Sequence, residues 1–147
     1  MKIHDQIVIH APIDQVFTAF TDLSNMPERI KGIEKIEILH EPAVMQVGTK
    51  WRETRTMFGK QATEEMWVTD LQPQQSYQVE AESNGVHYTS NYDFAEQDGS
   101  TLVKMTFVGK PLNVKAKLFS FMLVIFAGAT KKALHQDLED LKIFCEK

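Results

Sequence analysis

The sequence contains only one cysteine, Cys145, among its 147 residues. A single cysteine excludes a disulfide within the chain and is typical of proteins from reducing compartments. The first ten residues, MKIHDQIVIH, lack the apolar segment of a secretory signal, so we expect none. The longest uncharged run, residues 118–130, is too short to span a bilayer, which takes about 20 residues. These absences predict a cytoplasmic protein without a transmembrane segment.

Positive charge is also scarce. The chain has 16 lysine and arginine residues against 20 aspartate and glutamate residues, which gives a net charge of −4. An acidic balance argues against nucleic acid as a partner. The five histidines show no metal-ligand spacing, and the sequence has neither a glycine-rich phosphate loop nor a nucleophile elbow. We therefore expect no metal, no cofactor and no covalent catalysis.

The spacing of apolar residues predicts one strand and two short helices at the start of the chain. Isoleucines alternate with polar residues over Lys2–His10, as in a half-buried strand. Apolar residues then recur at helical spacing from Ile13 to Phe20, and another helical turn or two precedes Gly32. A second strand is predicted over Ile33–Leu39.

The middle of the chain has the pattern of an antiparallel meander. Asn84-Gly85 and Asp98-Gly99 are strong signals for tight hairpins. The strand-like runs between such turns are Thr49–Met57, Gln61–Leu71, Ser76–Ser83, Val86–Ala95 and Thr101–Val108. With the terminal segment, the predicted order is β-α-α-β-β-β-β-β-β-α.

The last segment, Pro111–Lys147, predicts one long helix. One face of that helix carries a row of core-facing residues: Ser120, Leu123, Ala127, Thr130, Leu134, Leu138, Leu141 and Cys145. The leucines of its second half should fill space, whereas the small residues of its first half should leave space beside Leu123. We therefore predict a cavity between that first half and the sheet. The alternative is that bulky sheet residues fill the gap.

Alternation along the strands indicates which side chains face the helix, because alternate residues share one face. The apolar set is expected inside, and the opposite faces are mostly polar, as in a single sheet wrapped on a helix. The residues predicted to bind a ligand are Trp51, Met66, Tyr88, Tyr92, Met105, Phe107, Leu123 and Ala127.

Four phrases of the sequence, in this order and spacing, resemble the START-related superfamily, which includes polyketide cyclase/dehydrase-like proteins. The phrases are IVIHAPIDQVFTAFTDLSNMP, VGTKWRET, VTDLQPQQSYQVEAES and GSTLVKMTFVGKP. The resemblance covers essentially the whole chain and implies an α+β helix-grip fold with a ligand pocket between the sheet and the terminal helix. The length of 147 residues and the absence of a Pro/Gly/Ser-rich linker predict one domain over residues 1–147. Many relatives carry a tryptophan after the position of Pro27, where this chain has Glu28-Arg29-Ile30.

Three charged residues are candidates for chemistry inside the predicted cavity. Glu53 and Arg55 share the inward parity of Trp51, and Glu64 has matching parity on the next strand. Enclosed charges must pair or bind a ligand, since an unpaired buried charge is very costly. Glu53 could transfer a proton while Arg55 stabilises an enolate-like charge, or the two could form a structural ion pair. Two acids beside one arginine favour a basic or hydroxylated ligand group.

The terminal helix also has an apolar patch on its outer face, formed by Leu118, Phe121, Met122 and Ile125. Exposed patches of this kind mark partners, membranes or ligand entrances. We predict a homodimer through this patch, with peripheral membrane contact as a second use. The alternative is that this segment bends and folds the four side chains inward.

Three functions follow from these patterns. The first is a carrier or sensor that binds an apolar small molecule, such as a lipid, quinone or aromatic metabolite. The second is a cyclase/dehydratase-type enzyme that uses Glu53 and Arg55. The third is a protein-interaction module that works through the apolar helix patch.

Overall fold

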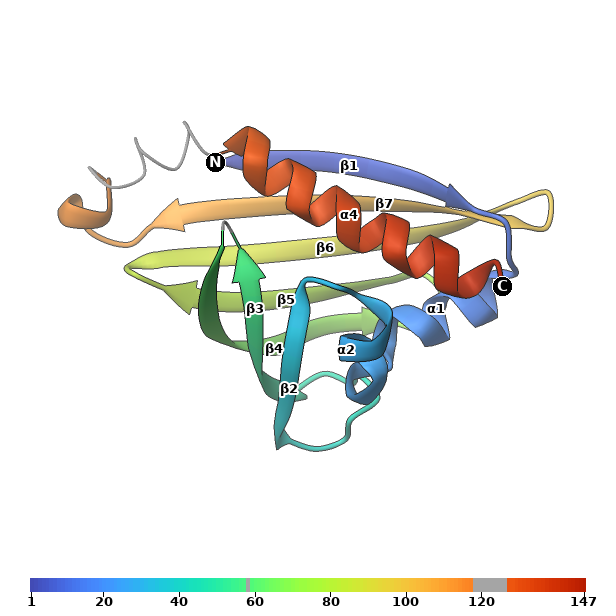
Figure 1. The fold of residues 1–147 in the computed structure, drawn as a ribbon, viewed down its shortest axis with the longest axis horizontal. Coiled ribbons are helices and arrows are strands. Elements are labelled where there is room, and N and C mark those ends of the chain that lie inside the picture. The colour runs from blue at the N-terminus through green and yellow to red at the C-terminus, as the bar shows by residue number, and fades with distance from the viewer. Residues whose placement is uncertain (58, 118–126) are drawn as a thin grey trace.

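A computed structural model describes residues 1–57, 59–117 and 127–147 of the chain. Seven antiparallel strands form one sheet, and helix α4 (Ala127–Cys145) crosses one of its faces (Figure 1). Three short helical elements lie between the first two strands of the chain. This is the predicted α+β architecture, in which a curved antiparallel sheet is wrapped on a C-terminal helix.

The sheet has the strand order β1-β7-β6-β5-β4-β3-β2, so β1 and β2 are its two edges. All neighbouring strands are antiparallel, as the predicted meander requires. The strands are β1 (Lys2–Ile9), β2 (Ile33–His40), β3 (Lys50–Met57), β4 (Lys60–Gln72), β5 (Ser76–Ser83), β6 (Val86–Gln97) and β7 (Ser100–Pro111).

The segment between β1 and β2 folds into α1 (Ile13–Thr21), the 3-10 turn η1 (Leu23–Asn25) and α2 (Met26–Arg29). Helix α1 follows Pro12 and buries its predicted apolar face, which includes Phe17 and Phe20. Both rings meet Phe94 of β6 edge to face, with centroids 5.1 and 5.2 Å apart. Aromatic packing therefore fills the space between sheet and helices at this end of the molecule.

The two predicted Asx-Gly hairpins are present. Asn84 and Gly85 have φ angles of 52° and 75°, and Asp98 and Gly99 have φ angles of 49° and 84°. Positive φ at both central residues is the geometry of a type I′ turn, whose twist matches that of the flanking strands. The turns fix the registers of β5 with β6 and of β6 with β7.

Contrary to the prediction, the chain does not become helical at Pro111. Pro111 is the last residue of β7 and pairs with Val86, and residues 114–117 are helical. Strand β1 pairs with β7 only up to Val108, so Pro111 has a neighbour on one side alone. A proline without an N–H fits such an edge position, and for this reason the strand continues to Pro111.

A bulge in β4 explains a pattern that alternation left ambiguous. The register with β5 shifts between Val68 and Asp70. As a result Met66, Val68 and Leu71 all pack against the hydrophobic core, although Leu71 is out of phase with the other two.

Candidate functional site

A cavity of about 320 Å³ lies between the sheet and α4. Strands β3 to β7 supply one wall, α4 supplies the opposite wall, and η1 and α2 close one end. Most of the lining side chains are apolar or aromatic. The volume is at the lower end of the range of about 300 to 1,000 Å³ that is usual for small-molecule sites.

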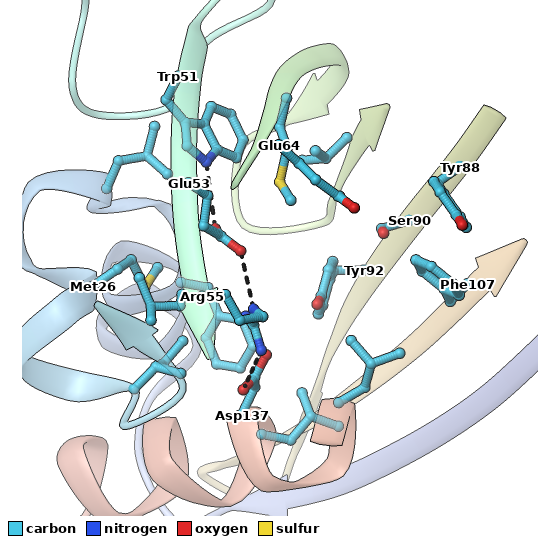
Figure 2. A pocket seen from close by; sticks show the side chains of 18 of the residues that line it. Met26, Trp51, Glu53, Arg55, Glu64, Tyr88, Ser90, Tyr92, Phe107 and Asp137 are labelled. Carbon is cyan, nitrogen blue, oxygen red and sulfur yellow. Dashed lines mark hydrogen bonds and ion pairs between the residues drawn. The ribbon is translucent and has the colours of Figure 1, made fainter. Parts of the chain in front are cut away.

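An internal ion-pair chain crosses this cavity (Figure 2). The Nε of Arg55 donates to Glu53 Oε2 at 3.2 Å, and its two terminal nitrogens donate to Asp137 Oδ1 and Oδ2 at 3.2 and 2.8 Å. The side chains of Arg55, Glu53 and Asp137 are 16%, 10% and 13% exposed. Trp51 Nε1 lies 3.5 Å from Glu53 Oε1 and supports the other carboxylate oxygen. Both carboxylates therefore meet the same guanidinium.

Burial and charge act in opposite directions on this chain of groups. Burial lowers the pKa of Arg55, but Asp137 and Glu53 outweigh it and hold that pKa above its ordinary value. Burial raises the pKa of Asp137, and Arg55 opposes this rise. Arg55 therefore stays charged, and two protein carboxylates neutralise its charge.

The sheet register and one helical turn bring these groups together. Glu53 and Arg55 alternate on β3, and Glu64 of β4 lies directly opposite Glu53. Asp137 comes from α4, and sequence analysis did not propose it. The signal was present, because Asp137 lies three residues after Leu134 and four before Leu141, on the apolar face of the helix.

Glu64 is the third carboxylate of the cavity, and its surroundings differ from those of Glu53. Burial raises its pKa, the charge of Glu53 raises it further, and Arg55 and a hydrogen bond with Ser83 lower it only in part. The carboxylate points into the cavity, on the side of Ser90 and Tyr88 (Figure 2). Its charge also raises the pKa of Tyr88, after the larger effect of burial.

Tyrosines line the rest of the polar surface. Tyr77 and Tyr92 stack with centroids 4.8 Å apart, and Tyr88 stacks on Phe107 at 5.3 Å. Burial raises the pKa values of Tyr77 and Tyr92, and nearby carboxylates raise them further, Glu53 for both and Asp137 for Tyr92. All three tyrosines therefore keep neutral hydroxyls at physiological pH.

The structure places the residues predicted from alternation as follows. Trp51, Met66, Tyr88, Tyr92 and Phe107 line the cavity, as do Glu53, Arg55 and Glu64.

Two predicted ligand contacts are not among the lining residues. Met105 is only 1% exposed, because its neighbours cover it completely, and Ala127 lies one turn before the first lining residue of α4, Thr130. Leu134, Leu138 and Leu141 of α4 border the cavity, although all three were expected to fill space. The described helix wall therefore belongs mainly to the second half of the predicted helix, whereas the cavity was predicted under its first half. Leu123 lies outside the described residues.

The remaining predictions concern the apolar helix patch, metal binding, membrane spanning and the single cysteine. The patch of Leu118, Phe121, Met122 and Ile125 lies outside the part of the chain that the structure describes. Within residues 1–57, 59–117 and 127–147, no group of side chains could hold a metal ion, and no helix is long and apolar enough to cross a membrane. Burial raises the pKa of Cys145 to about 11, so its thiol stays protonated.

Comparison with known proteins places this geometry in context. A family described as polyketide cyclase/dehydrase and lipid transport matches residues 1–144. No curated protein matches the chain in sequence.

Solved structures match at low sequence identity. The Zhui aromatase/cyclase from Streptomyces sp. R1128 superimposes with a TM-score of 0.78 at 17% identity, covering 99% of this chain and 93% of that one. Ginseng major latex-like protein 151 from Panax ginseng gives a TM-score of 0.77 at 13% identity, covering 100% and 98%. A protein from Thermus thermophilus gives 0.77 at 14% identity, covering 97% and 94%. At these identities the likeness shows the fold alone.

Proposed function

The chain belongs to the polyketide cyclase/dehydrase and lipid transport family, and on that basis we propose that it is a binding protein for an apolar small molecule. The molecule would be held between the sheet and α4 by the aromatic and aliphatic walls. This function is a carrier or a sensor, since neither role needs a reaction in the cavity.

One observation carries this proposal, namely the cavity of about 320 Å³ with its apolar lining. A packed interior normally leaves few voids larger than a water molecule. A space of this size with an apolar lining is therefore typical of a small-molecule site rather than of a packed interior. The pairing of Arg55 favours binding over catalysis, because three of its five N–H groups already donate to Glu53 and Asp137.

Native mass spectrometry of freshly purified protein tests this proposal. We expect a fraction of the protein to carry added mass, and extraction into organic solvent should release an apolar compound. For protein that has lost its ligand, titration with the neutral fluorescent dye aminoanthracene provides the second measurement. Protein that carries no added mass and does not bind the dye would contradict the proposal.

A second candidate is a cyclase/dehydratase-type reaction, favoured by the raised pKa of Glu64 beside the cavity. A carboxyl with a raised pKa is suited to general acid or base work near neutral pH. Glu64 is better suited than Glu53, which is committed to Arg55. Turnover of an enolisable polyketide mimic that is lost in Glu64→Gln would support this function, whereas binding without turnover would favour the carrier.

We also propose that the protein acts in the cytoplasm, where its one thiol, Cys145, would stay reduced. The chain is proposed to act as one domain, since its sheet and terminal helix share one core. The interaction-module hypothesis depends on residues outside the described part of the chain, and it stays a prediction. Sedimentation of wild type against a Phe121→Asp/Ile125→Asp variant tests it.

A further inference from the structure

Negative charge is in excess at the cavity wall. Among the described lining residues, Glu53, Glu64 and Asp137 carry carboxyl groups. The lining cations are the Arg55 side chain and the terminal ammonium of Met1, which donates to the Gly109 carbonyl. Transfer of an uncharged polar group from water into an apolar interior costs on the order of 2 to 7 kcal/mol when it makes no hydrogen bond, and transfer of a charged group costs more. A buried charge therefore needs a partner of opposite sign. The balance of lining charges therefore points to a ligand that brings positive charge.

The one guanidinium is largely committed to protein carboxylates. All three nitrogens of Arg55 already donate to protein carboxylates, one to Glu53 and two to Asp137. The pairing with Asp137 is bidentate, the strongest arrangement that an arginine makes with a carboxylate. A carboxylate or phosphate on the ligand could reach only the two remaining N–H groups of Arg55, and it would compete with these carboxylates for the same charge.

Glu64 lacks the support that Glu53 and Asp137 receive. Among the described residues its hydrogen-bond partner is the uncharged hydroxyl of Ser83, and its strand neighbour Glu53 repels its charge. The charge of Arg55, which pairs with Glu53 and Asp137, offsets this only in part. The carboxylate points into the cavity toward the side of Tyr88 and Ser90 (Figure 2). A cation bound there would remove the cost of ionising Glu64.

The tyrosine hydroxyls give an independent indication of a polar ligand group. Tyr77 lines the cavity, and its hydroxyl has no hydrogen-bond partner among the described residues. No buried side-chain polar atom of the described residues lacks a partner, so this hydroxyl is open to the cavity and can meet a polar group of a ligand. The aromatic rings of Tyr88 and Phe107, stacked next to Glu64, also present the π-faces that attract cations.

We propose that the ligand carries a protonated amine on an apolar, ring-containing body, and that the amine binds Glu64 between Tyr88 and Ser90. This inference deepens the proposed binding function and rests on it. The apolar walls take the body of the ligand, Glu64 takes the charge, and the excess of carboxylates rejects fatty acids and other anions.

Three indoles that share one ring system and differ in charge test the proposal. They are tryptamine, tryptophol and indoleacetate, which are cationic, neutral and anionic at neutral pH. Calorimetric titration of the full chain should give an affinity for tryptamine about tenfold or more above that for indoleacetate, with tryptophol between them. Glu64→Gln should reduce tryptamine binding about tenfold and leave tryptophol binding unchanged.

Glu65→Gln is the matched control, because Glu65 is the next residue of β4 and points to the opposite face, where it pairs with Arg52 and Lys50. It should change none of the three affinities. Equal binding of indoleacetate and tryptamine to the wild type would overturn the amine proposal, as would a Glu64→Gln variant that keeps tryptamine affinity. Binding of aminoanthracene without binding of any indole would also overturn it, and in that case the general binding function would stand. Failure of the dye as well would remove both.

Discussion

Arg55 is the residue on which the polar side of the cavity depends. It is the shared partner of Glu53 and Asp137, and its side chain is 16% exposed. Without it, two carboxylates would face each other in a mostly apolar space. Removal of one member of such a group is more damaging than replacement of the whole group, because the remaining charges have no counter-ion.

Arg55→Ala should therefore lower the free energy of unfolding by about 3 to 5 kcal/mol, as loss of one partner does for buried ion pairs. Arg52→Ala is the control on the same strand, because Arg52 is 42% exposed and pairs with Glu37 and Glu65 on the outer face. Exposed pairs contribute little, so the control should lose much less stability. Urea unfolding of both variants measures the difference, and equal losses would show that the Arg55 chain is not a buried pair.

Glu64 should give the protein a specific pH dependence. Its folded-state pKa is raised by burial and by Glu53, so the folded state favours the protonated carboxyl. Stability from this group is present below the ordinary glutamate pKa of about 4.3 and is lost as the pH rises through the raised pKa. Glu64→Gln, which keeps the neutral shape, should therefore be more stable than wild type at about pH 8 and gain nothing at about pH 4.

Urea unfolding at both pH values checks this prediction, with Glu65→Gln as the exposed control. A gain for Glu64→Gln of the same size at both pH values would mean that ionisation of Glu64 is not the cause. The control should show no gain that grows with pH.

For individual residues, the sequence predicted the strand residues of the site better than the helix residues. Alternation has a period of two, so the inward side of Glu53, Arg55 and Glu64 followed directly from the inward side of Trp51. Asp137 was missed because a single acid on an apolar helix face does not reveal its role until its partner across the cavity, Arg55, is known. Met105 was misplaced because parity gives the face of a strand but not how deeply a side chain is covered.

The bounds of the strands depend on the turns between them as much as on apolar patterns. Asn84-Gly85 and Asp98-Gly99 have nearly the same backbone geometry but different surroundings. A Cβ on Gly85 would lie 3.1 Å from the Cβ of Ala116, whereas a Cβ on Gly99 would meet nothing within 4 Å. The first turn therefore also supports the segment that follows β7, and the second does not.

Gly85→Ala should be more destabilising than Gly99→Ala. Both variants force an alanine into the left-handed region, which costs about 1 to 2 kcal/mol. Only Gly85→Ala also pushes against the buried Ala116, which is 4% exposed. Thermal or urea unfolding of the two variants gives the comparison, and a Gly99→Ala loss as large as that of Gly85→Ala would contradict this role for the first turn.

The element boundaries that the sequence missed have local physical causes. Pro111 suggested a helix start, yet it ends β7 because β1 stops opposite Val108 and frees that side of the strand. The β4 bulge after Val68 could not be read from alternation, since a bulge changes parity without a glycine or proline to mark it. Strand pairing, which is a tertiary property, decides both.

The whole molecule divides its interior into a filled part and an open part. Phe17, Phe20 and Phe94 pack edge to face where α1 meets the sheet, and the cavity occupies the space along α4 beside the Arg55 ion pairs. The ion pairs and stacked tyrosines on its wall distinguish the open part from a void left by poor packing. The α+β order and the family resemblance were both predictable from the sequence, because they depend on patterns that run over the full chain. The extent of the cavity was not, because it depends on how far side chains from the strands reach toward one helix.

We propose that the space between sheet and α4 binds an apolar molecule, and a pair of neighbouring substitutions on β6 tests this binding. Ser90 lines the cavity, whereas the adjacent Thr89 has the opposite parity and faces outward. Both are replaced by tryptophan, folding is verified by circular dichroism, and the affinity for aminoanthracene is measured by fluorescence titration. We expect Ser90→Trp to lower the affinity for the dye by about tenfold or more, and Thr89→Trp to leave it unchanged. Binding of the dye to folded Ser90→Trp as tight as to wild type would contradict the proposal.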